Sequence, residues 1–215
     1  MPPRMLLLLV GLAALTALIQ INLLAIAFDK LGLSPHAAMT LVLFALFGSA
    51  INLPLVRITA EAPAEPPPPL PAWLQPLQIP FEGTTLIAVN LGGCIIPVAF
   101  SAYLMAHNPL PFFEVLSAIA IVSLVSYRLS RPIPRLGIAM PVLVAPFTAA
   151  LTALLINAEH AAPLAYISGT LGVLIGADLL RLGDIRKMGT PLASIGGAGT
   201  FDGIFITGIV AALLA

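Results

Sequence analysis

The stretch APLAYISGTLGVLIGADLLR, residues 162–181, decides the class of this chain. It contains no charged side chain before Asp178. A helix needs roughly 20 predominantly apolar residues to cross the hydrocarbon core of a bilayer, so this stretch has spanning length. Across all 215 residues, 60% are hydrophobic and 8% are charged, which is more apolar surface than a soluble core can bury. The sequence therefore predicts an integral membrane protein.

Seven segments of the chain have the length and composition of a membrane span. They cover residues 5–27, 37–56, 83–106, 112–130, 137–157, 162–181 and 189–215. We therefore expect an all-α, polytopic membrane helix bundle with about seven transmembrane helices. The chain would then consist of a transmembrane hairpin over 1–56, a Pro-rich cytoplasmic linker over 57–82 and a five-helix membrane core over 83–215.

The positive side chains predict an orientation in the membrane. With seven spans, all of the 9 Lys and Arg residues except Lys30 fall on one side. Cytoplasmic loops are enriched in Lys and Arg, so this pattern places the N-terminus in the cytoplasm and the C-terminus outside.

The last span contains a cluster of helix breakers. They are Pro191, Gly196, Gly197 and Gly199. A continuous helix from Lys187 would carry Asp202 about 22 Å into the membrane, whereas counting the 13 residues back from Ala215 places Asp202 only roughly 10 Å from the cytoplasmic side. We therefore expect a broken helix near 189–200.

Asp178 and Asp202 are the candidate catalytic residues. A carboxylate in the centre of a membrane helix costs roughly 2.5–3.5 kcal/mol on insertion scales, so each is a functional-site hypothesis by default. Counting residues from the helix ends places both in the cytoplasmic third of the membrane. Two close carboxylates in a dry site share a proton, so one acts as an acid and the other as a base that activates water against a carbonyl. The candidate substrate-binding residues are Asn90, Gly196, Gly197, Gly199 and Thr200.

Structural roles for the same aspartates remain open. Asp178 and Arg181 are spaced i,i+3, the spacing of an ion pair at a helix end. Asp202 follows the glycine-rich break, where a carboxylate can cap the exposed N–H groups of a half-helix. Asp184 lies beside two positive residues of a predicted loop, and we interpret it as a solvated loop charge.

The last two spans resemble those of the presenilin and signal-peptide-peptidase class of intramembrane aspartyl proteases. In that class one aspartate lies on a helix that runs inward, and the second lies in a Gly-x-Gly-Asp motif on the next, outward helix. Asp178 and Asp202 have this arrangement in the predicted topology, although the second motif reads Gly199-Thr200-Phe201-Asp202. The resemblance implies hydrolysis of a transmembrane peptide by this pair.

A second functional class uses the same residues differently. Residues 90–94 and 194–198 share a Gly-Gly break, and transporters bind their substrates near the membrane midplane at interrupted helices. Under this alternative the protein is a proton- or cation-coupled transporter of a small solute, with Asp202 at the broken-helix site beside Asn90 and Thr200. A third alternative is a structural membrane protein with no enzymatic activity.

Several runs extend over most of the chain outside the linker. They are Asn90-Leu-Gly-Gly, Arg131-Pro-Ile-Pro, residues 165–172, Gly176-Ala-Asp-Leu-Leu and residues 195–205. In these runs the chain resembles a prokaryotic family of uncharacterised multi-pass membrane proteins, a domain of unknown function numbered 1614. This resemblance implies a bacterial or archaeal plasma membrane protein and implies no activity.

The expected partners are the lipid bilayer and either a transmembrane peptide or a small solute. No basic stripe with interleaved aromatic residues indicates nucleic acid. The three histidines are not spaced as ligands on one helix face, and Cys94 is single, so we expect no metal and no cofactor. The substrate, the oligomeric state and the role of the linker do not follow from the sequence.

Overall fold

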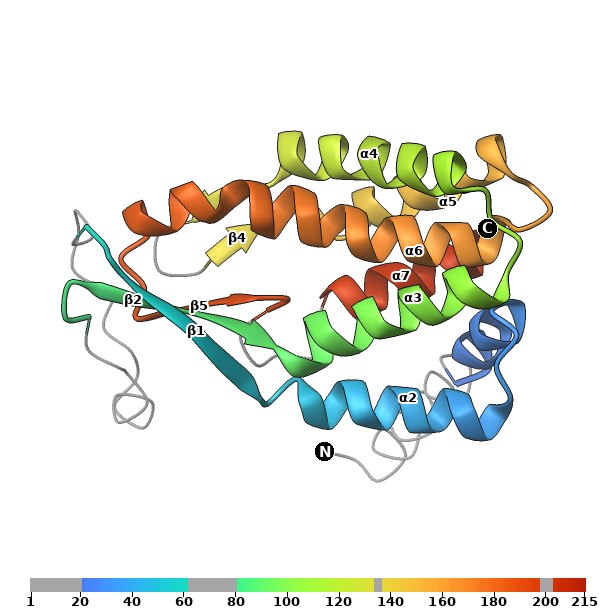
Figure 1. The fold of residues 1–215 in the computed structure, drawn as a ribbon, viewed down its shortest axis with the longest axis horizontal. Coiled ribbons are helices and arrows are strands. Elements are labelled where there is room, and N and C mark those ends of the chain that lie inside the picture. Colours follow the sequence, from blue (N-terminus) through green and yellow to red (C-terminus); the bar gives the residue numbers. More distant parts are fainter. Residues whose placement is uncertain (1–20, 62–80, 134–136, 198–202) are drawn as a thin grey trace, which may run out of the picture.

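The computed structural model describes residues 21–61, 81–133, 137–197 and 203–215 (Figure 1). Its α-helices are Ile21–Lys30, α2 (Pro35–Gly48), α3 (Ile96–His107), α4 (Phe112–Leu129), α5 (Val144–Ile156), α6 (Ala161–Val173) and α7 (Gly203–Leu214). Three shorter helical segments are the π-helical turns η2 (Leu91–Ile95) and η3 (Leu174–Asp178) and the 3₁₀ segment η4 (Leu179–Lys187). The strands are β1 (Asn52–Thr59), β2 (Thr84–Asn90), β3 (Arg131–Ile133), β4 (Gly137–Ala139) and β5 (Leu192–Ile195).

Helix α6 is the centre of the bundle, and it packs against α3, α4, α5 and α7. Glycines of α6 and of the following turn η3 permit this close contact. A Cβ atom at Gly172 would lie 2.6 Å from Cβ of Val122, and one at Gly176 would collide with the carbonyl oxygen of Ser123. Tyr166 on another face of α6 is fully buried, with its ring edge-on to Phe100 at 4.9 Å. The apolar core of the bundle forms around this helix.

A three-stranded sheet lies at one end of the bundle, in the strand order β1-β2-β5. Strands β1 and β2 are antiparallel, whereas β2 and β5 are parallel, with Leu86 opposite Leu192 and Val89 opposite Ile195. Two of these strands are directly connected to helices of the bundle. Helix α2 precedes β1 in the chain, and β2 continues through η2 into α3. Figure 1 shows the sheet at one end of the long axis and the bundle at the other.

Two close backbone contacts, each made at a glycine, join the sheet to the bundle. A Cβ atom at Gly48, the last residue of α2, would lie 3.0 Å from the backbone nitrogen of Gly92 in η2. A Cβ atom at Gly196, directly after β5, would lie 2.7 Å from both the nitrogen and the Cβ of Cys94. The turn η2 is therefore held between the end of α2 and the end of β5.

The all-α expectation is correct for the bundle and wrong for the sheet. The predicted helical spans 37–56 and 83–106 contain the start of β1 and all of β2, 137–157 begins with β4, and 189–215 contains β5. Strands β1 and β2 are rich in Val, Ile and Thr, which favour pleated structure, and an apolar run of this length has no period that separates a strand from a helix. The break near 189–200 is confirmed over its described part, where a strand and the three left-handed glycines Gly189, Gly196 and Gly197 replace the helix.

Two helices in the described residues are long and apolar enough to cross a membrane, Phe112–Leu129 and Ala161–Lys187. A third span is formed if Ile21–Lys30 and Pro35–Gly48, bent by 110°, count as one. These helices are compatible with a membrane protein, while seven spans and the orientation of the termini remain predictions. The division at 56 and 82 also remains a prediction; β1 extends across its first boundary.

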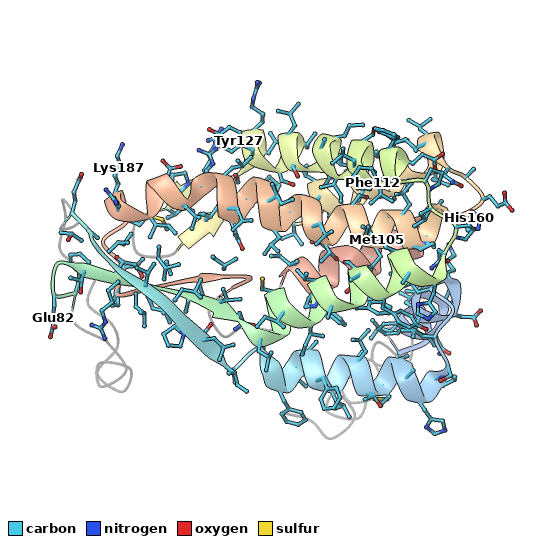
Figure 2. All side chains as sticks on the ribbon, in the orientation of Figure 1. Glu82, Met105, Phe112, Tyr127, His160 and Lys187 are labelled. Atoms are coloured by element: carbon cyan, nitrogen blue, oxygen red, sulfur yellow. The ribbon has the colours of Figure 1, made fainter. Side chains whose placement is uncertain are left out.

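The polar ends of the molecule are well separated along the long axis. Figure 2 shows Lys187 and Glu82 at the end with the sheet, and His160 at the opposite end, where α6 begins. Between these ends, large apolar side chains of α2, α4 and α5 are exposed on the outside of the bundle, among them Phe47, Leu124 and Leu155. This distribution is typical of a protein whose middle contacts lipid.

Candidate functional site

A cavity of about 630 Å³ lies where the bundle meets the sheet. Its walls come from β4, the start of α5, η3, η4, β5 and α7. Most of its lining is apolar. The polar side chains that line it are Asp178, Thr190, Ser194 and Thr207. A mainly apolar cavity with a few convergent polar groups is the usual form of a small-ligand or substrate site.

Asp178 is the last residue of the π-helical turn η3, and among the described residues it is the one carboxylate that lines this cavity. Its Oδ2 accepts a hydrogen bond of 2.7 Å from the backbone N–H of Gly196. A π-helical turn inserts one extra residue into an α-helix and re-aims the side chains after it, and such turns are frequent at functional sites. At the end of this turn the carboxylate of Asp178 meets the backbone directly after β5.

Gly196 must be glycine for two separate reasons. Its φ of +84° lies in the left-handed region, and Gly197 follows with φ +94°. A Cβ atom at Gly196 would also lie 2.7 Å from the carbonyl carbon of Gly93. Only glycine combines this backbone conformation with this close approach, and it thereby allows the N–H of residue 196 to reach the Asp178 carboxylate.

Asn90 is fully engaged in holding the sheet to the bundle. Its side-chain nitrogen donates to the carbonyl oxygen of Ser49 at 2.7 Å and to Oδ1 of Asn52 at 3.0 Å. Its Oδ1 accepts from the N–H of Gly93 at 2.8 Å, which caps η2. Asn90 is buried and is not among the residues that line the cavity. The structure therefore does not bring Asn90 to Asp178.

The other predicted site residues divide into two groups. Gly197 lines the cavity, and Gly196 binds Asp178. Gly199, Thr200 and Asp202 lie outside the described residues. Their neighbours in the chain, Gly197 on one side and Ile204 on the other, both line the cavity.

Arg181 binds Asp184 and the end of α4, so the proposed ion pair with Asp178 is wrong. Its Nη1 lies 3.1 Å from Oδ2 of Asp184, the one salt bridge among the described parts of the chain. Its Nη2 donates to the carbonyl oxygens of Tyr127 at 2.6 Å and Ser130 at 2.8 Å. Three residues make one turn of η4, so Arg181 and Asp184 lie on the same face. Asp184 is therefore a paired residue and not the solvated loop charge that we expected.

Sequence reasoning missed Thr190, Ser194 and Thr207. Thr190 precedes β5 by two residues, and Ser194 belongs to β5. This four-residue strand lies in a stretch whose sequence pattern predicts an interrupted helix. Ser194 Oγ donates to Oδ1 of Asn52 at 2.5 Å, across β2. The dipeptide Thr190-Pro191 is the one sequence signal for an extended backbone here, because a residue that precedes proline is sterically disfavoured in the helical region.

Comparison with protein families now identifies the chain. The model of a family described as a protein of unknown function, DUF1614, matches residues 46–214. The chain belongs to the DUF1614 family. Among curated proteins and solved structures, nothing matches the DUF1614 chain. The resemblance of its last two helices to presenilin-type proteases finds no support in these comparisons.

The DUF1614 match begins in the last turn of α2 and ends in α7, so it includes the sheet, both π-helical turns and the complete lining of the cavity. The helix Ile21–Lys30 lies outside it. The cavity thus belongs to the part of the DUF1614 chain that defines the family.

Proposed function

We propose that this protein is a multi-pass protein of the prokaryotic plasma membrane that hydrolyses a peptide bond in the cavity at Asp178. Asp178 and Asp202 are the acid–base pair in this proposal. The observation that carries it is the 2.7 Å hydrogen bond from Gly196 to one oxygen of Asp178, inside a mainly apolar cavity. A carboxylate held in one orientation at the wall of a substrate-sized cavity has the placement that acid–base chemistry requires.

The chemistry assigns a different task to each carboxyl group. With Oδ2 of Asp178 bound to Gly196, the other oxygen has no hydrogen bond to the described residues and is available for water. The ionised carboxylate removes a proton from water as the water oxygen attacks the peptide carbonyl carbon. The protonated partner gives its proton to the carbonyl oxygen, which yields a gem-diol. When the C–N bond breaks, the first carboxyl gives the proton it took from water to the amine nitrogen, and the partner takes back a hydroxyl proton as the C=O bond re-forms.

Asp202 is the proposed partner because of its position in the chain. It directly precedes Gly203, the first residue of α7, and the first turn of α7 contributes Ile204 and Thr207 to the cavity wall. Asp178 and Asp202 are also the carboxylates of the last two predicted spans. Strand β5 and the left-handed glycines lie between them in the chain.

The test is peptide cleavage by the purified protein in lipid nanodiscs. Apolar transmembrane peptides that carry a fluorophore and a quencher are offered to the wild type, Asp178→Asn and Asp202→Asn. Each substitution should lower the cleavage rate about 10²- to 10⁴-fold, the usual contribution of a general acid or base. Asp29→Asn is the matched control, because Asp29 is exposed at the opposite end of the molecule. Cleavage by Asp202→Asn at the wild-type rate would reject the pair.

A coupled transporter is the second candidate, and one observation favours it. The parallel strands β2 and β5 each lead into a break, and the two breaks touch where Gly196 lies against Gly93 and Cys94. Paired interruptions in the membrane are typical of transporter binding sites. In proteoliposomes with a pH-sensitive dye inside, this candidate predicts solute-dependent proton uptake that Asp178→Asn abolishes, with no peptide cleaved by either form. A structural protein would show neither activity.

A further inference from the structure

Within the described residues, strand β5 has one free edge, and that edge faces the cavity. In the order β1-β2-β5 it pairs on one side only, with β2. All of its residues, from Leu192 to Ile195, line the cavity. An edge strand presents unpaired N–H and C=O groups that can pair with another chain.

The pairing with β2 shows which backbone groups face the cavity. The N–H of Leu86 donates to the carbonyl oxygen of Pro191 at 3.0 Å, and Leu86 lies opposite Leu192. Along a strand, alternate residues direct both backbone groups to the same neighbour. Pro191 and Ala193 therefore face β2, while Leu192 and Ser194 direct their N–H and C=O groups to the free edge.

The carbonyl groups of this edge are satisfied locally, but its donors are not. The carbonyl oxygen of Leu192 accepts from Oγ1 of Thr190 at 2.8 Å, and that of Ser194 accepts from the N–H of Gly197 at 3.2 Å. Within the described residues, the N–H groups of Leu192 and Ser194 have no partner. Two backbone donors two residues apart thus face a mainly apolar cavity, where an unmade hydrogen bond is costly.

Asp178 occupies the third position of the same edge. The next N–H after those of Leu192 and Ser194 belongs to Gly196, and it donates to Asp178. The carboxylate therefore lies where a carbonyl group of an adjacent strand would lie. A strand rises about 3.3 Å per residue, so the position two residues beyond Ser194 is roughly 7 Å away along the edge.

We propose that the cavity binds an extended apolar polypeptide segment as an additional strand on β5. Carbonyl groups of the segment accept from Leu192 and Ser194, and the peptide group two residues further along then lies beside Asp178. The apolar lining accommodates the side chains, and the exposed Val142 and Leu143 show that the cavity reaches an apolar part of the surface. This inference rests on the proposed function, because it makes the bound segment the substrate of Asp178. Addition of a strand gives affinity through backbone hydrogen bonds and leaves specificity to side-chain pockets.

The probe is a short fluorescein-labelled peptide of alternating valine and alanine with blocked ends, titrated against the purified full chain in nanodiscs by fluorescence anisotropy. The control probe has the same sequence with every backbone nitrogen methylated; it keeps its carbonyl groups, but the methyl groups project between paired strands, block the approach to β5 and make the probe more apolar. We expect saturable binding of the first probe and binding at least about tenfold weaker for the second. Equal binding of both probes, or no saturable binding of the first, would overturn the inference.

Leu192→Pro tests the same edge from the protein side. Proline removes the N–H that faces the cavity and leaves the bonds to β2 in place, because those come from the alternate residues. Binding should fall about tenfold in Leu192→Pro and by less in Leu192→Ala, which keeps the N–H. Equal losses in the two variants would show a side-chain effect and reject the edge. If Leu192→Pro does not fold, the comparison of the two probes on the wild type decides alone.

Binding and cleavage separate this inference from the function on which it rests. A probe that binds through β5 but is never cleaved would support the strand site and count against the hydrolase. Cleavage of the unmethylated probe by Leu192→Pro at the wild-type rate would reject the strand site and leave the hydrolase standing.

Discussion

Gly196 rests directly on Cys94, with the position of its missing Cβ atom 2.7 Å from both the nitrogen and the Cβ of Cys94. The contact joins the end of β5 to the π-helical turn that begins the α3 segment. On its other side, Gly196 donates to Asp178 at 2.7 Å. One glycine therefore connects the two breaks of the helical structure to the carboxylate of the cavity.

Gly196→Ala should destabilise the protein strongly. Alanine must adopt a φ of +84° and would collide with the backbone of Gly93 and Cys94. Left-handed strain and overpacking together should lower the free energy of unfolding by roughly 2–4 kcal/mol. Thermal unfolding in detergent measures this. Gly183→Ala is the control, since a Cβ atom there meets nothing within 4 Å. Equal melting temperatures of the two variants would contradict the contact.

Asp178→Asn should leave the stability of the fold almost unchanged, whereas Asp178→Ala should lower it. The amide oxygen of asparagine can still accept from the Gly196 N–H, but alanine leaves this donor unpaired. We expect a loss below about 1 kcal/mol for asparagine and roughly 1–3 kcal/mol for alanine. Unfolding in detergent compares the two. A melting temperature of Asp178→Ala equal to that of the wild type would show that the hydrogen bond contributes no stability.

Asn90→Ala should loosen the attachment of the sheet to the bundle. It removes the bonds to Ser49 and Asn52 and leaves the N–H of Gly93 without its cap. The expected loss is roughly 2–4 kcal/mol, the sum of several buried hydrogen bonds. Asn108→Ala is a suitable comparison, because Asn108 makes one side-chain bond at the end of α3. Hydrogen exchange of β2 should become faster in Asn90→Ala, and unchanged exchange would argue against this role.

Arg181→Lys should be destabilising although it keeps the charge. The guanidinium of Arg181 binds two carbonyl oxygens at the end of α4 and a carboxylate, and it lies 4.3 Å from the centre of the Tyr127 ring. A lysine ammonium cannot reproduce this planar set of contacts. We expect a loss of roughly 1–3 kcal/mol, compared with almost none for the exposed Arg128→Lys. Similar unfolding curves for the two variants would be the opposite result.

The candidate site could be predicted only in part. Asp178 and the glycines at 196 and 197 were found because a carboxylate and helix breakers stand out in an apolar sequence. The hydrogen-bond partner of Asp178 could not be predicted, because the i,i+3 spacing indicates an ion pair with Arg181. In the structure Arg181 instead binds Asp184 and the end of α4. Asn90 was assigned to the site on its polarity, but three contacts from separate segments engage it elsewhere.

The sequence by itself determined the apolar helix over residues 162–181 and the break after Pro191. These features are local, because they follow from composition, helical spacing and the backbone limits of proline and glycine. Only the tertiary structure decided that β1, β2 and β5 are strands and that Gly196 meets Asp178. Strand pairing joins residues more than 100 positions apart, such as Leu86 and Leu192, and no local pattern encodes which apolar runs will meet.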